Sequence, residues 1–348
     1  MDFIYYKTNT FRCPFTFKAG IAASFCNLFI STLQSIPAYF FFVLLFCLLS
    51  TSPSYAENKS ILIITDNSFE RTKQISLNLE QHFINNENIS VKISQYQNIS
   101  LKQIIDENPA LIITLGSKAS KLASSSSIPT LHTLISENSL KDLGLCAENN
   151  CTSSQSNTNR SYAIYLDQPI SRQLNFITLL LPDSKKIGVL TANFSFPKLE
   201  QLQAESTKRN LVLKTRQIEN GAKLSRQLNQ LIGDIDVLFT LPDPLIHNRN
   251  NIPYLLLSTY RHNIPVIGFS KAYVNAGAIA AIYSSSTQIT KHIHELATEI
   301  LFSSEPIKFS SFPAKYFSIA INKRVARSLE LHLPDTQIIK SKLIQLEK

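Results

Sequence analysis

The sequence predicts an α/β protein with two doubly wound parallel sheets. Its strands are continuous apolar runs, such as residues 60–66, and helices with one apolar face stand between them. Continuous apolar strands are typical of parallel sheets that helices cover on both faces. The alternation of strands and helices begins again at residue 186, and 348 residues with 44% hydrophobic content are enough for two cores. We therefore expect two such domains.

The first series of strands and helices contains a polar turn at Gly116 and Ser117. Glycine lets the backbone approach a ligand there, and the exposed N–H groups of the next helix favour a carboxylate or phosphate. The alternative is an ordinary turn in which Ser117 caps the helix. The predicted elements of this series are strands 60–66, 91–93, 110–115 and 128–131 and helices 69–85, 101–107 and 118–124.

A second series follows strand 161–165, which is expected to carry the chain into the second domain. Its helices end at recognisable stops, such as Pro182 after helix 170–181. The remaining predicted elements are strands 186–190, 211–216, 237–240 and 264–269, helices 198–209, 224–232, 251–260 and 287–302, and a strand that ends near residue 283.

The stretch between residues 237 and 270 organises the chain. Strand 237–240, helix 251–260 and strand 264–269 form a βαβ unit, so the two strands should be parallel and neighbouring. Asp243 and Ser270 then follow the carboxyl ends of adjacent strands. Open α/β sheets bind ligands at that edge.

Residues 1–56 have the pattern of a secretory leader. Basic residues precede an uncharged span with its apolar peak at 39–49, and the small residues Ser54 and Ala56 stand where a signal peptidase cleaves. The alternative is an uncleaved membrane anchor, since the uncharged span is long enough to cross a bilayer.

The charge and its distribution argue against a nucleic-acid partner. The leader carries three basic residues and one acidic residue, so the remaining chain keeps +7 of the total +9. Its basic residues are scattered among acids, whereas nucleic-acid binders concentrate them on one face.

Two of the five cysteines remain after the leader, Cys146 and Cys151, in a polar loop. In an oxidising compartment they are expected to form a local disulfide.

The sequence shows no catalytic motif. It lacks GxGxxG, GxxxxGK[ST] and GxSxG, so neither a nucleotide loop nor a nucleophile elbow is predicted. His292 and His294 are two residues apart and face different sides of a helix, while His247, His262 and His332 are expected at the surface. We expect no enzyme, no cofactor and no metal.

Several motifs occur in the same order as in a known family. Residues 180–190 match LLPxxKxxGVL, residues 264–270 read IPVIGFS, residues 276–281 read AGAIAA, and residues 321–329 resemble INxxxAxxL. Together they resemble the bacterial ABC-transporter substrate-binding proteins of unassigned or aromatic-amino-acid specificity. After strand 128–131 the chain departs from the family, because the Asp-Pro element and the GxNxTG turn are missing.

This resemblance implies a type I periplasmic-binding-protein fold, with two lobes joined by a hinge of several crossovers. The N-terminal lobe would comprise residues 57–162 and about 286–312. The C-terminal lobe would comprise residues 163–285 and about 313–348.

The implied function is capture of a small, amino-acid-like ligand by a periplasmic monomer that delivers it to an ABC permease in the inner membrane. The alternatives are a periplasmic sensor or accessory protein and, less favoured, an exported enzyme. Asp243 would bind a ligand amine, and Phe194, Phe196 or Tyr273 could stack on an aromatic group. The expected polar contacts are Gly116 and Ser117 from the first lobe and Asn193, Ser195, Asp243 and Ser270 from the second.

Overall fold

The computed structural model describes residues 58–66, 70–85, 88–145, 160–304, 307 and 311–347. The predicted leader, residues 1–56, and the predicted disulfide between Cys146 and Cys151 lie outside these ranges. Among the residues described, no helix is long and apolar enough to span a membrane.

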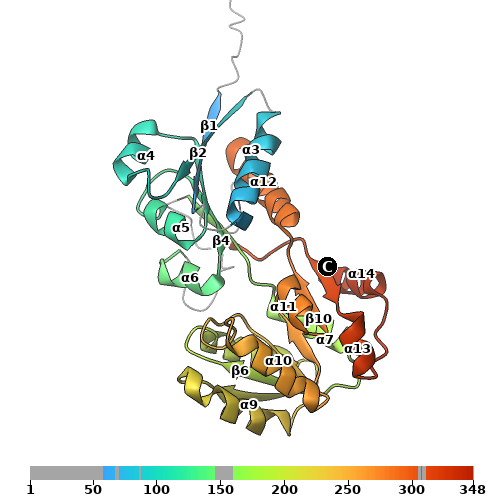
Figure 1. Ribbon diagram of the computed structural model, residues 1–348. Helices are drawn as coiled ribbons and strands as arrows, with labels where there is room; N and C mark the ends of the chain where they lie inside the picture. Colours follow the sequence, from blue (N-terminus) through green and yellow to red (C-terminus); the bar gives the residue numbers. More distant parts are fainter. Residues whose placement is uncertain are drawn as a thin grey trace, which may run out of the picture. The chain divides into compact units, whose positions relative to one another are not determined.

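The first sheet contains six parallel strands in the order β11-β5-β4-β3-β1-β2. Helices cover both of its faces, and the late helix α12 lies beside α3 (Figure 1). The strands are β1 (Lys59–Thr65), β2 (Ile89–Gln95), β3 (Leu111–Leu115), β4 (Thr130–Ile135), β5 (Ser161–Tyr165) and β11 (Ser311–Phe312). The helices are α3 (Glu70–Ile84), α4 (Leu101–Glu107), α5 (Ser117–Ala123), α6 (Glu137–Asp142) and α12 (Ser286–Phe302).

Alternate residues of β1 enter two separate cores. Ile63 packs in the cluster that holds Leu79 of α3 and Ile293 of α12. Ile64 packs in the cluster that holds Ile104 of α4. Because successive side chains of a strand point to opposite faces, a strand that is apolar throughout needs helices on both sides.

The second sheet has the order β12-β10-β9-β8-β6-β7 and is parallel apart from its antiparallel edge strand, β12. Its strands are β6 (Lys186–Thr191), β7 (Val212–Gln217), β8 (Val237–Phe239), β9 (Val266–Gly268), β10 (Ala280–Tyr283) and β12 (Ser318–Ile321). Its helices are α7 (Ile170–Leu180), α8 (Leu199–Thr207), α9 (Leu224–Ile232), α10 (Asn251–Arg261), α11 (Lys271–Ala276), α13 (Lys323–Ser328) and α14 (Thr336–Leu346), with 3-10 turns η1 (Phe196–Lys198) and η2 (Gly221–Lys223).

The predicted βαβ unit is confirmed. Strands β8 and β9 are parallel neighbours, joined through α10, and Leu238 pairs with Val266. Asp243 and Ser270 therefore follow the carboxyl ends of adjacent strands, as the sequence indicates.

The chain passes between the two sheets three times, at residues 166–169, 284–285 and 313–317. One residue from each crossover joins a hydrogen-bonded chain: Gln168 Nε2 donates to Ser284 Oγ at 2.8 Å, and Ser284 Oγ donates to the Tyr316 carbonyl at 2.6 Å. Arg172 of α7 also donates to Gln168 Oε1 at 2.8 Å.

The predicted lobe boundary after residue 162 falls inside β5, which pairs with β4 as far as Tyr165. The division into lobes stays a prediction.

Candidate functional site

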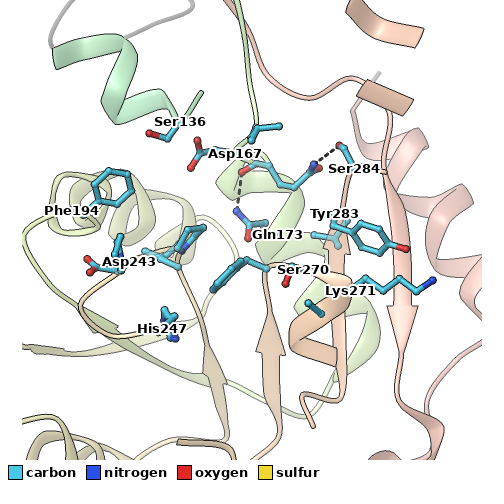
Figure 2. A pocket seen from close by; sticks show the side chains of 18 of the residues that line it. Ser136, Asp167, Gln173, Phe194, Asp243, His247, Ser270, Lys271, Tyr283 and Ser284 are labelled. Atoms are coloured by element: carbon cyan, nitrogen blue, oxygen red, sulfur yellow. Dashed lines mark hydrogen bonds between the residues drawn. The ribbon is translucent and has the colours of Figure 1, made fainter. Parts of the chain in front are cut away.

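A cavity of about 710 Å³ lies where loops from both sheets meet. The second sheet contributes residues that follow the carboxyl ends of β6, β8 and β9, together with the end of β10. The first sheet contributes residues that follow β4 and β5, and α3 adds Arg71. Figure 2 shows these side chains, with Asp243 and Ser284 on different sides of the view. This is the edge at which parallel sheets bind ligands.

Asp243 is held in place by three donors from its own chain. It lies between two prolines that end β8, and only 3% of its surface is exposed. Its Oδ2 accepts from the Ser195 N–H at 2.9 Å and from the Ser195 hydroxyl at 2.8 Å, while Oδ1 accepts from the Leu245 N–H at 3.0 Å. These bonds tie the turn after β8 to the turn after β6.

Ser195 holds the Asp243 carboxylate through its N–H and its hydroxyl. It is 1% exposed, its Oγ accepts from the Ala192 N–H at 3.0 Å, and it is not among the cavity-lining residues that the structure describes. Ser195 and Asp243 were both predicted to contact the ligand. The structure brings them together, but the Ser195 hydroxyl is bonded to Asp243 and does not line the cavity.

Ser270 follows the neighbouring strand, β9, and is the N-cap residue of α11. Its side chain accepts from the Tyr273 N–H at 3.1 Å and caps the helix. Two residues before Ser270, the packing requires a glycine at position 268, because an added Cβ would lie only 2.9 Å from the Cβ of Tyr273. The close packing of Tyr273 over β9 fixes the start of α11 and hence the position of Ser270.

Three rings pack together below this turn: His247, Phe269 and Tyr273, with ring centroids 5.2–5.5 Å apart. His247 Nδ1 lies 3.0 Å from the Tyr273 hydroxyl oxygen. Burial lowers the pKa of His247 to about 4, and the nearby Asp243 only partly opposes this shift, so the ring is neutral at neutral pH. Burial also raises the pKa of Tyr273, whose hydroxyl stays protonated. The prediction that His247 lies at the surface is wrong, because His247 lines the cavity.

One wall of the cavity is an ion-pair cluster. Lys198 of η1 pairs with Asp167, which follows β5, and lies 3.8 Å from Glu137 Oε2. Asp167 Oδ2 also accepts from the Glu137 N–H at 2.8 Å. Next to this cluster Asn138 donates to the Phe194 carbonyl. Loops from the two sheets are thus joined directly beside the cavity.

Arg71 and Ser284 form another part of the cavity wall. Arg71 donates to the Ser284 carbonyl at 3.0 Å. Although Arg71 is exposed as a whole residue, partial burial lowers its pKa from the ordinary value. An arginine remains charged at neutral pH because its ordinary pKa is above 12. The wall is therefore cationic.

Two of the six predicted contact residues, Asp243 and Ser270, line the cavity. Gly116, Ser117 and Asn193 are not among the lining residues that the structure describes. Gly116, with φ of 103°, is itself the N-cap of α5, and its N–H donates to the Thr133 carbonyl at 2.9 Å. The alternative in which Ser117 caps the helix is therefore wrong, while the ligand-binding roles stay predictions.

Of the aromatic candidates, Phe194 lines the cavity, Phe196 is exposed and Tyr273 is buried beneath it. The sequence analysis did not predict the lining residues that lie in or beside the crossovers, because their positions depend on how the chain passes between the two sheets. An acidic residue two positions after the end of strand β5 was the available signal for one of them, Asp167. The missed polar lining residues used below are Arg71, Asp167, Gln168, Gln173, Lys198, His247, Lys271, Tyr283, Ser284 and Ser286.

The described part of the chain contains no group of three or more metal-ligating side chains. Charged and hydroxyl side chains surround an apolar surface made by residues such as Phe194, Leu241 and Phe269. Cavities of this composition are typical of sites for small organic molecules.

Residues 78–342 match a family of ABC transporter substrate binding proteins. No match among curated proteins was found for this sequence.

Solved structures of low identity share the fold. A substrate-binding protein with adhesive properties from Clostridium difficile, in its ligand-free, open structure, is 18% identical with a TM-score of 0.65, over 80% of this chain and 96% of that one. A conserved domain protein from Vibrio cholerae is 19% identical with a TM-score of 0.56, over 82% and 98%. The ABC domain in complex with L-Trp from Streptococcus pneumoniae is 17% identical with a TM-score of 0.55, over 81% and 98%.

The fold is the two-lobed α/β architecture of type I periplasmic binding proteins, as the sequence predicts. The matched family consists of binding proteins, so the expectation of a non-enzymatic protein agrees with it. With three quarters of its length matched, the chain belongs to the family of ABC transporter substrate-binding proteins.

Proposed function

We propose that this protein is exported, captures a small, amino-acid-like solute in the cavity between its lobes, and delivers it to an ABC permease. The observation that carries the proposal is the 710 Å³ cavity at the carboxyl edges of both sheets. Its volume falls within the range of small-ligand sites. The L-Trp complex of the Streptococcus pneumoniae protein supports an amino-acid-like ligand.

Asp243 and Ser270 are the predicted contacts that we retain for this cavity. Phe194 and Phe269 would pack against an apolar part of the solute. Gly116, Ser117, Asn193 and Ser195 stay predictions, and their contribution would depend on how the lobes move.

Closure of the lobes around the solute would use the three crossovers as a hinge. Hinges in two-lobed binding proteins are a few residues that absorb a change in backbone angles. Here the chain from Gln168 through Ser284 to Tyr316 links the crossovers, so we expect them to move as one unit. A solute that contacts both walls would then favour the closed arrangement.

A periplasmic sensor or accessory protein is the second candidate. The family's Asp-Pro and GxNxTG elements are missing after β4, and the chain there begins α6 instead. A changed rim favours a changed partner. Genes for a permease and an ATPase beside this one would favour transport, and their absence would favour the sensor.

The test is to purify the exported protein under native conditions and identify co-purifying small molecules by mass spectrometry. A thermal-shift screen of amino acids, organic acids, amines and sugars runs in parallel, because a bound ligand stabilises the folded state by mass action. A solute that raises the melting temperature supports capture. If no solute co-purifies and no compound of the panel raises the melting temperature, the proposed capture is contradicted.

A further inference from the structure

We infer that this cavity selects its ligand through a carboxylate held at Arg71, and that it has no requirement for an ammonium group. The inference rests on the proposed function, since it assumes that the cavity is the ligand site. It differs from the expectation that Asp243 binds an amine.

The two carboxylates that line the described cavity are already occupied. Asp243 accepts three hydrogen bonds from Ser195 and Leu245, out of about four that a carboxylate can accept. Asp167 accepts from the Glu137 N–H and is paired with Lys198, so its countercharge is supplied by the protein. An incoming ammonium would find one remaining lone-pair direction on Asp243 and a neutralised Asp167.

The cations are less fully engaged. Three of them line the cavity, and Lys198 is paired. Within the described ranges, neither Arg71 nor Lys271 forms an ion pair. Arg71 uses one donor for the Ser284 carbonyl, whereas a guanidinium has five. The bond to Ser284 holds the guanidinium at the wall and leaves four N–H groups for a carboxylate, a partner that arginine can bind in bidentate fashion.

Several neutral groups of the cavity can also donate to a ligand. The Ser270 oxygen accepts from the Tyr273 N–H, so its own proton is available for a ligand. The hydroxyls of Tyr283 and Ser286 have no hydrogen-bond partner among the described residues. Gln173 Oε1 is an acceptor that stays open, because its amide nitrogen donates to the Gln168 carbonyl. A lining that offers donors and cations matches a ligand rich in acceptors.

The geometry separates the two ends of an amino-acid-like ligand. Arg71 acts at the Ser284 side of the cavity, and Figure 2 shows Asp243 on the other side of the view, beyond Ser270. A carboxylate at Arg71 would gain a charge-assisted contact without breaking any bond on the Asp243 side. An ammonium at Asp243 would be confined to the remaining position on Oδ1, beside the Leu245 N–H, because Oδ2 already accepts twice from Ser195.

The first experiment compares ligands on the unmodified protein. The panel contains L-amino acids, each with its deaminated acid and its decarboxylated amine, and affinity is measured by calorimetry. We expect each acid to bind within about threefold of the parent amino acid. The matching amines should bind about 10- to 100-fold more weakly, the loss expected for a hydrogen bond to a charged group. Amines that bind as well as the acids, or a panel in which no acid binds, would overturn the inference.

The second experiment uses variants. Arg71→Met should weaken the acids about 10- to 100-fold, whereas Arg216→Met, which removes a guanidinium from the exposed edge strand β7, should leave affinity unchanged. Asp243→Asn should weaken an amino acid and its deaminated acid by the same factor, since Asp243 acts by supporting the turn. A loss confined to ligands with an ammonium would overturn the inference. A neutral co-purifying solute would also overturn it while leaving the proposed capture function intact.

Discussion

Two turns of this protein follow equivalent strands, yet only one of them reaches the cavity. The turn after β3 begins with Gly116 and Ser117, and the turn after β8 contains Asp243; each follows a buried parallel strand near the middle of its sheet. Asp243 lines the described cavity, whereas Gly116 starts α5 at once. The prolines beside Asp243 and its bonds to Ser195 keep the second turn out of a helix. The end of a buried parallel strand is therefore not sufficient to place a residue in the cavity, since the turn after β8 reaches it and the turn after β3 does not.

The largest effect that would test this difference is expected for Asp243→Ala. The substitution leaves the Ser195 N–H and hydroxyl buried without their acceptor, and we expect the free energy of unfolding to fall by about 3 kcal/mol. Urea denaturation measures it, with Ser270→Ala, whose capping bond is worth about 1 kcal/mol, as the matched control. A loss below about 1 kcal/mol would mean that the turn after β8 is not held by Asp243.

Acid should destabilise both turns by a similar mechanism. His132 lies beside Thr114 of β3, and burial lowers the pKa of His132, like that of His247, to about 4. Between pH 6.5 and 4 the unfolded chain binds protons that the folded protein does not, so stability falls as the pH falls, by up to about 1.4 kcal/mol per pH unit for each histidine. Denaturation from pH 7 to 4.5 should show a shallower slope for His132→Gln than for the unmodified protein. Equal slopes would refute a buried neutral His132.

Gly116→Ala should have a smaller effect, confined to stability. A φ of 103° is strained for any residue with a Cβ, at a cost of about 1–2 kcal/mol, although nothing lies within 4 Å of the added atom. Ligand affinity should change by less than about threefold. A larger loss of affinity with normal stability would place the Gly116 turn in the ligand site and remove the contrast between the two turns.

Ser117→Ala should change almost nothing. Ser117 is exposed, and its hydroxyl has no hydrogen-bond partner among the described residues, so we expect unfolding to change by less than about 0.5 kcal/mol. The same samples measure affinity. A clear loss of binding would restore Ser117 as a ligand contact and sharpen the question of how the lobes move.

Much of the fold could be predicted because the patterns are long or uninterrupted. Leu101–Glu107, Ser161–Tyr165 and Leu224–Ile232 have the predicted bounds. The short helices α6 and α11 were missed, since six residues do not show a helical period. The elements after residue 302 were not predicted either.

The cavity could be predicted only in part, for a related reason. Asp243 and Ser270 follow strand ends, a position that the βαβ pattern gives directly. Arg71 reaches the cavity because a helix of the first sheet meets a crossover that leaves the second, more than 200 residues later. His247 has polar neighbours in sequence, and only the packing of Phe269 and Tyr273 shows that it is enclosed. Such contacts depend on tertiary structure.

The position of α12 and β11 has a consequence for folding during synthesis. Both belong to the first sheet's side of the molecule, yet they are translated after nearly all of the second sheet. Until then, the face that holds Ile63 and Leu79 lacks the helix that covers it. Contacts between segments so distant in sequence form slowly, and apolar surface exposed in the meantime promotes aggregation. A nascent chain of this protein should therefore stay dependent on chaperones until residue 302 has emerged, even though its first five strands are already made.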